Sequence, residues 1–132
     1  MLVDKGYKVI SLTSSELKMN HVENIYNKDW DNVISILIHA EFFIGLGSGL
    51  SWLNWALNKK TYMIAGFSED GHEFTNNLTR ITNNICIKCW NDPVLVFDAG
   101  DWDWCPVYKG TDRQHICQKS ITPIQVFNSL AI

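Results

Sequence analysis

Four cysteines within one stretch of the chain, between residues 83 and 120, most constrain how this sequence can fold. They follow the spacing C-x2-C-x15-C-x11-C. The residues around them show little helical periodicity and are rich in turn formers, so the stretch has little core of its own. One metal ion on four soft sulfur ligands would order it. The spacing therefore predicts a tetrahedral metal site on Cys86, Cys89, Cys105 and Cys117.

Other arrangements of the four thiols stay open from the residues alone. Buried, unpaired thiols are the second interpretation, and two disulfides would require an oxidising compartment. A redox C-x-x-C is disfavoured because Trp90 and the turn after it, rather than a helix, follow Cys89. His115 could replace one sulfur as a ligand. In each metal-bound form the role is structural, since four protein ligands leave no open position for a substrate.

Composition and charge exclude several classes of protein. The 132 residues are 46% hydrophobic and 19% charged, which is typical of one folded domain and not of a disordered chain. A net charge of -3, with Lys and Arg scattered singly, predicts no nucleic-acid partner. The most apolar stretch, residues 33–57, is interrupted by His39, Glu41 and Asn54, so no membrane span is expected. The N-terminus resembles no secretory signal, and we expect a cytoplasmic protein with reduced thiols.

The first half of the chain alternates strand and helix patterns. Asp29 is a suitable N-cap for the first of two apolar helical stripes. The first stripe is Trp30, Val33, Ile34, Leu37 and Ile38, and the second is Leu50, Leu53, Ala56 and Leu57. Short runs rich in β-branched and aromatic residues lie between the stripes. The pattern up to about residue 68 predicts a βαβαβ arrangement with a parallel sheet, formed by a strand at 8–12, a helix at 30–38, a strand at 41–45, a helix at 50–57 and a strand at 61–67.

The two ends of the sequence also carry helix signals. Gly6 is placed to end a helix of which only residues 1–5 are present, and this shortened helix leads us to expect a fragment of a longer protein. At the other end, Thr122, Pro123 and Gln125 stand at the N-cap, N1 and N3 positions of a helix expected at about 122–131.

A glycine-rich turn, residues 45–51, is the candidate ligand site. It joins a predicted strand to a predicted helix, where backbone N–H groups and the helix dipole favour an anion such as a diphosphate. The hydroxyls of Ser48 and Ser51 could add donors, and Trp52 is either a core aromatic or a ligand contact. The turn matches neither the dinucleotide-binding fingerprint nor the P-loop, and a purely structural turn is the alternative.

Taken together, these residues resemble the C-terminal part of bacterial autotransporter heptosyltransferases over essentially the whole chain. The resemblance lies in the turn and helix at 47–53, the strand at 63–67, the four-cysteine segment and the helix that begins at Thr122. It implies an α/β fold: residues 1–132 would form an incomplete Rossmann-like C-terminal domain of a GT-B glycosyltransferase. This donor-binding domain would carry a metal finger at about 83–120.

The family's activity, site and partners follow as implications of the resemblance. Such enzymes transfer heptose from ADP-heptose to serine residues of autotransporter adhesins and assemble into large rings, so a homo-oligomer is implied. The matching metal finger holds iron, although four thiolates alone would suit zinc equally. The donor-binding positions are Ser48, Gly49, Leu50 and Ser51 around the diphosphate, with Glu16 accepting a ribose hydroxyl.

The chain also departs from related enzymes. Lipopolysaccharide heptosyltransferases have Asp-Thr-Gly-Leu-Ser-His at the turn, whereas Gly47, Ser48 and Trp52 stand here at the Asp, Thr and His places. No catalytic residue is assigned, because the acceptor domain of a GT-B enzyme would lie outside these residues, and we expect the isolated chain to be inactive. The alternatives are a metal-stapled protein-interaction module and an inactive truncated remnant.

Overall fold

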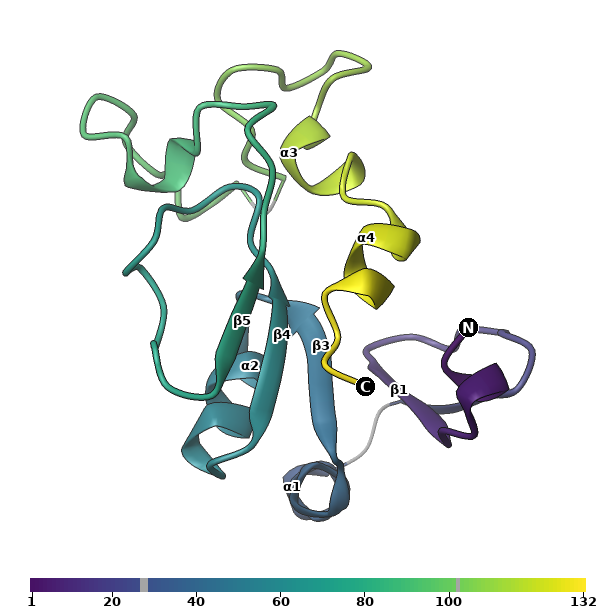
Figure 1. Ribbon diagram of the computed structural model, residues 1–132. Coiled ribbons are helices and arrows are strands. Elements are labelled where there is room, and N and C mark those ends of the chain that lie inside the picture. Colours follow the sequence, from purple (N-terminus) through teal and green to yellow (C-terminus); the bar gives the residue numbers. More distant parts are fainter. Residues whose placement is uncertain (27–28, 102) are drawn as a thin grey trace. The chain divides into compact units, whose positions relative to one another are not determined.

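The computed structural model describes residues 1–26, 29–101 and 103–132, which form two compact units, 1–41 and 42–132. Trp102, inside the predicted metal finger, lies outside the described residues. The structure combines helices with parallel strands, so the α/β class is confirmed (Figure 1). The hydrogen bonds define two sheets, β1-β2 and β3-β4-β5, where the sequence predicted one.

Residues 1–41 contain a short 3-10 helix, two parallel strands and a helix. The predicted end of the first helix at Gly6 is confirmed, since Gly6 has a φ of 87°. The predicted N-cap is also confirmed, because a carboxylate oxygen of Asp29 accepts the Asn32 N–H at 2.9 Å. Of the predicted apolar stripe, Leu37 is buried, whereas Trp30 and Ile38 are exposed. The elements are η1 (Val3–Lys5), β1 (Val9–Thr13), β2 (Val22–Tyr26) and α1 (Trp30–His39).

Residues 42–132 are built on a three-stranded parallel sheet in the order β3-β4-β5. Its elements are β3 (Phe42–Leu46), α2 (Gly49–Ala56), β4 (Lys60–Ile64) and β5 (Leu78–Ile81). Phe42 lies opposite Lys60, and Thr61 lies opposite Leu78. All three strands end at the same edge of the sheet, where Figure 1 shows the loops of residues 83–120. In parallel sheets this edge is where ligands bind.

The central strand β4 is buried on both faces. Thr61 and Met63 point to the side of α2, where Asn54 donates to Thr61 at 2.9 Å and Met63 packs with Phe74. Tyr62 points to the opposite side, and its hydroxyl oxygen accepts the Ala131 N–H at 3.0 Å. Helical and C-terminal segments therefore cover the two faces, and β4 carries the core of this unit.

Helix α2 turns a polar face inward, which the sequence did not predict. The apolar stripe that we expected to be buried, Leu50, Leu53, Ala56 and Leu57, is half-buried or exposed. The two fully buried residues are Ser51 and Asn54. The Ser51 hydroxyl donates to the Leu46 carbonyl, and the Asn54 amide donates to the carbonyls of Lys59 and Lys60. These bonds satisfy strand-end carbonyls at both ends of the helix, which places the polar side chains inside.

The cysteine segment contains little regular structure. The residues between 83 and 120 that the structure describes are largely irregular, with two short helical turns, η2 (Cys89–Asn91) and α3 (Ile116–Lys119). Helix α4 (Pro123–Asn128) is shorter than predicted but begins at the predicted capping box: Thr122 accepts the Gln125 N–H at 3.3 Å, and the Gln125 side chain accepts the Thr122 N–H at 2.8 Å.

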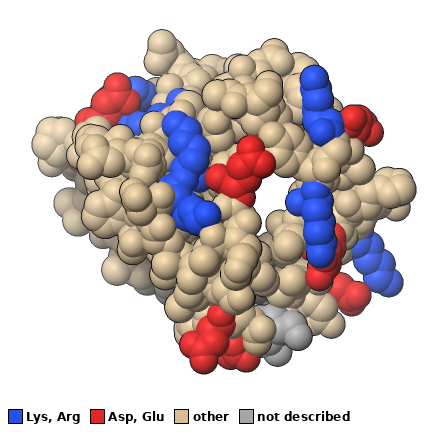
Figure 2. Space-filling model, turned by 60° about the horizontal axis from the view of Figure 1, so that its bottom comes forward, with Lys and Arg blue, Asp and Glu red and all other residues tan. Residues whose placement is uncertain are grey.

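Two further observations concern the lengths of the helices and the charges on the surface. Within the described ranges, no helix is both long and apolar enough to cross a bilayer. On the face shown in Figure 2, most of the surface is uncharged, and Lys and Arg side chains are spread among Asp and Glu side chains. That face offers no broad basic area for a phosphate backbone.

Candidate functional site

The turn between β3 and α2 presents hydrogen-bond donors to open space. Ser48 is the N-cap of α2, and its exposed hydroxyl makes no capping hydrogen bond. Among the described residues, no acceptor is recorded for the backbone N–H groups of Gly49 and Leu50. A Cβ built on Gly49 would have no atom within 4 Å. Unpaired N–H groups at a helix N-terminus suit an anion such as a phosphate group.

Ser51 shapes this turn from inside. Its side chain is fully buried, its hydroxyl donates to the Leu46 carbonyl at 2.5 Å, and its N–H donates to the Ser48 carbonyl at 3.0 Å. The predicted use of the Ser51 hydroxyl as a direct donor to a ligand therefore competes with a bond that the fold already makes. Ser48, Gly49 and Leu50 remain the positions open to a ligand.

Glu16 lies in the other compact unit, on the exposed loop after β1. Asn24 on β2 organises this loop, since its amide donates to Thr13 at 3.1 Å and its oxygen accepts the Leu17 N–H at 3.0 Å. Glu16 thus follows the carboxyl end of a strand, as the nucleoside assignment requires. Its role stays a prediction.

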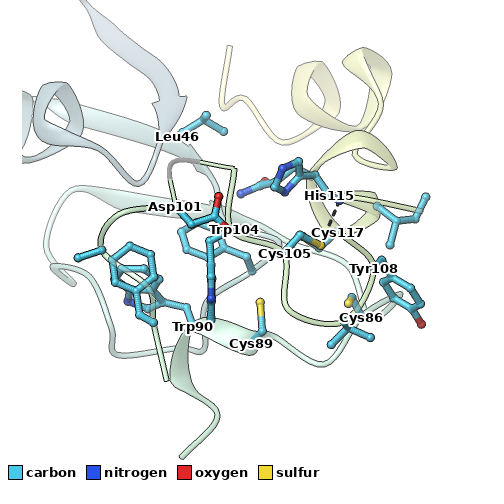
Figure 3. Close-up of a pocket in the computed structure, with 16 residues that line it drawn as sticks. Leu46, Cys86, Cys89, Trp90, Asp101, Trp104, Cys105, Tyr108, His115 and Cys117 are labelled. Carbon is cyan, nitrogen blue, oxygen red and sulfur yellow. Dashed lines mark hydrogen bonds between the residues drawn. The ribbon is translucent and has the colours of Figure 1, made fainter. Parts of the chain in front are cut away.

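The four cysteines line one pocket of about 310 Å³ near the carboxyl end of β3. Figure 3 shows them reaching this space from separate parts of the segment. Cys89, Cys105 and Cys117 are buried, Cys86 is half-buried, and all four are free thiols. Cysteines far apart in the sequence thus line the same pocket, and the four-cysteine metal site stays a prediction.

The pocket disfavours thiolates in the absence of a cation. The pKa of Cys89 is raised to about 11, mainly by burial and then by charge repulsion from the three other cysteines. Burial, followed by repulsion from Cys86, also raises the pKa of Cys117. A metal cation would remove both penalties, so the chemistry of this donor set fits a metal. The described residues contain no closed group of three or more His, Cys, Asp or Glu side chains around one point, and the tetrahedral site stays a prediction.

His115 contacts one of the cysteines through its backbone and an acidic residue through its ring. The His115 N–H donates to Cys105 Sγ at 3.5 Å, and Lys88, between the first two cysteines, has a φ of 56°. The His115 ring lies with Nε2 at 2.8 Å from an Asp103 carboxylate oxygen. This contact is the main reason why the pKa of Asp103 is lowered. His115 thus supports Cys105 through its backbone, while its ring pairs with Asp103.

The raised thiol pKa values predict how the metal-free chain responds to alkali. The ordinary pKa of Cys89 is 9.0 and its folded value is about 11, so the folded state retains a proton that the unfolded state loses. The contribution of the Cys89 thiol to the free energy of unfolding should be fully present below pH 9. The free energy of unfolding should then fall by on the order of 1–2 kcal/mol as the pH rises to about 11. Urea unfolding of the chelated, reduced chain measures this loss. Cys89→Ala should flatten the profile, and a wild-type profile that rises over this range would contradict the assignment.

Sequence reasoning missed a buried ion pair beside the turn, Glu73 with Arg80. Glu73 is 7% exposed, and its Oε2 lies 3.3 Å from Arg80 Nη1. The one available signal was a charged residue inside the β-rich run Leu78–Ile81, because no motif links positions 73 and 80.

The sequence of this chain is similar to those of known proteins. No family model matches the sequence. Autotransporter heptosyltransferase TibC of Escherichia coli O78:H11 is 46% identical over 93 residues, which are 70% of this chain and 23% of TibC. Inactive autotransporter heptosyltransferase BimC of Burkholderia thailandensis is 35% identical over 97 residues, 74% of this chain and 23% of BimC.

A solved structure extends the similarity. It is the crystal structure of dodecameric, iron-containing heptosyltransferase TibC in complex with ADP-D-beta-D-heptose. It matches 97% of this chain and 37% of that chain, with a TM-score of 0.85 and 37% identity. By sequence and by structure, the chain belongs to the family of the autotransporter heptosyltransferases, as a segment that spans 23% of the length of the curated relatives compared here.

Proposed function

We propose that this chain is the donor-binding part of an autotransporter heptosyltransferase. In this proposal residues 1–132 belong to the Rossmann-like C-terminal domain of a GT-B enzyme, and the β3–α2 turn binds the diphosphate of ADP-heptose. The observation that carries it is the turn itself, because the N–H groups of Gly49 and Leu50 have no acceptor among the described residues and the Ser48 hydroxyl makes no capping hydrogen bond. The TibC structure, which contains ADP-heptose, supports the choice of donor.

The cysteine pocket is assigned a structural metal ion, held by Cys86, Cys89, Cys105 and Cys117. Iron is the proposed metal because TibC is iron-containing, and zinc is the alternative for a four-thiolate site. The pocket supports this assignment because all four cysteines line it and because the pKa values of Cys89 and Cys117 are raised. When bound, the metal supplies folding energy and no open coordination position. The finger at about 83–120 would depend on it for order.

The remaining parts of the proposal concern the whole enzyme. The acceptor would be serine residues of an autotransporter adhesin, the enzyme would act in the cytoplasm, and the full-length chains would form a homo-oligomer, as TibC does. Because these residues correspond to only 23% of TibC, the isolated chain would bind the donor without transferring its sugar.

ADP binding tests the donor assignment. We expect ADP to slow hydrogen exchange of the backbone amides at 48–51. Gly49→Ala should weaken ADP binding about tenfold, because its methyl group enters the open space at the turn without meeting protein atoms. Calorimetric titration measures the affinity, and the melting temperature should stay near that of wild type.

Ser35→Ala, at an exposed position on α1, is the control and should bind ADP as wild type does. A wild-type chain in which ADP protects no amide of the turn would exclude the donor assignment.

A metal-stapled interaction module is the second candidate function. The observation that favours it is the loop after η2, where Val94 is 82% exposed and Val96 is 88% exposed. Apolar side chains so open to water are typical of surfaces that contact a partner. This candidate predicts no response of the turn to ADP, so the same exchange experiment separates the two functions.

A further inference from the structure

A buried carboxylate lies directly behind the β3–α2 turn. Glu73 is 7% exposed, and a Cβ built on Gly47 would lie 3.5 Å from its Oε1. Gly47 immediately precedes Ser48, the N-cap whose following N–H groups are open. A negative charge is therefore held at the base of a turn whose donors suit an anion.

The hydrogen bonding of this carboxylate is incomplete. The Ser68 hydroxyl donates to Oε1 at 2.6 Å. Oε2 is buried and accepts no hydrogen bond from the described residues, although it faces Arg80 Nη1 at 3.3 Å. Burying a carboxylate is costly unless it is paired and hydrogen-bonded. Because Oε2 has no hydrogen-bond donor, the charge of Glu73 depends on its ion pair with Arg80 for compensation.

Arg80 balances that charge and closes the loop around it. It lies on β5 opposite Met63, whose sulfur would be 3.6 Å from a Cβ on Gly47. Its guanidinium donates to the Ser68 carbonyl at 2.8 Å and to the Asp70 carboxylate at 3.0 Å. The loop between β4 and β5 is therefore fixed beside the turn by one arginine.

The local charges do not cancel completely. Three acids gather here, Glu69, Asp70 and Glu73, against two bases: Arg80, which pairs with Asp70 and Glu73, and Lys88, which pairs with Glu69 at 3.2 Å. Asp70 and Glu69 are exposed at the side chain, so water screens them, whereas Glu73 is screened poorly. The charge with the strongest effect on the turn is that of Glu73.

We propose that the Glu73–Arg80 pair sets how tightly the β3–α2 turn holds a diphosphate. Glu73 opposes the bound anion, and Arg80 offsets Glu73. This inference rests on the proposed function. The pair keeps the binding of a nucleoside diphosphate weak enough for its release after each transfer, and product release is the rate-limiting step of many enzymes. Both are positioning residues, because neither needs to touch the ligand.

Two substitutions of opposite sign test the proposal, with ADP and inorganic pyrophosphate as calorimetric probes. Glu73→Gln should tighten binding of both probes about three- to tenfold, because it removes the opposing charge and keeps the shape. Arg80→Met should weaken both by a similar factor. A purely structural role predicts weaker binding for both variants. Arg80→Lys, which retains the charge, should recover most of the wild-type affinity.

Asp70→Asn is the matched control, since it removes a carboxylate from the same arginine at a side chain that is 89% exposed, and it should change affinity less than about twofold. If Arg80→Met does not fold, the direction of the Glu73→Gln change decides. Wild-type binding with unchanged or weaker binding by Glu73→Gln overturns this inference alone. No binding of ADP by the wild type overturns the proposed function and this inference with it.

Discussion

Replacing Cys89 by serine is expected to release the metal ion and unfold residues 83–120, while the sheet β3-β4-β5 keeps its fold. The described part of this segment forms two short helical turns, η2 and α3, and the order of the segment would come from the metal. A four-thiolate site contributes on the order of 10 kcal/mol to folding, which exceeds the effect of most single substitutions. Elemental analysis for iron and zinc per chain, together with hydrogen exchange, measures both parts of the prediction.

Val94→Ser provides the control for this experiment, because it changes an 82% exposed residue in the same segment and should keep the full metal content. One iron per wild-type chain would agree with the relationship to TibC, and one zinc would keep the site while changing its ion. A wild-type chain that purifies with neither metal, or a Cys89→Ser chain that retains a full equivalent, would contradict the four-cysteine site.

Gly66→Ala is expected to be strongly destabilising, by about 3 kcal/mol, for a reason unrelated to backbone torsion. A Cβ on Gly66 would lie 2.0 Å from the Cys117 carbonyl oxygen and 2.6 Å from its carbonyl carbon. Both are backbone atoms, and the oxygen also accepts a hydrogen bond from Asn83 at 2.9 Å. The methyl group must push the cysteine segment away from the end of β4. Thermal melting should show a loss of roughly 10–15 °C.

Gly49→Ala serves as the comparison here, since no atom lies within 4 Å of the added methyl, and its melting temperature should match that of wild type. A Gly66→Ala chain that melts within about 2 °C of wild type would show that the two segments separate easily. In that case, the cysteine pocket would not be tied to the sheet at this point.

Features that depend on neighbours in sequence were predictable. The caps at Asp29 and Thr122, the end of η1 at Gly6 and the strand–turn–helix at residues 42–56 each follow from side chains within a few residues of one another. Local hydrogen bonding fixes such features, so a single sequence is enough to find them.

Features that depend on residues distant in the sequence could not be predicted. Strands β2 and β5 carry weak local patterns and exist because they pair with β1 and β4. The inward face of α2 was assigned to leucines, although Ser51 and Asn54 are buried to satisfy carbonyls outside the helix. The same limit applied to the candidate site: the spacing drew attention to four cysteines that line one pocket, but nothing in it revealed Glu73 behind the turn.

Leu46 takes part in both regions of interest. Its carbonyl accepts the Ser51 hydroxyl that shapes the turn, and its side chain lines the pocket of the four cysteines. The turn and the cysteines, some forty residues apart in the chain, are therefore joined through one residue. Coupling between two sites is reciprocal. If ordering of the pocket stabilises the start of α2, then binding of a ligand at the turn must stabilise the ordered pocket by the same free energy.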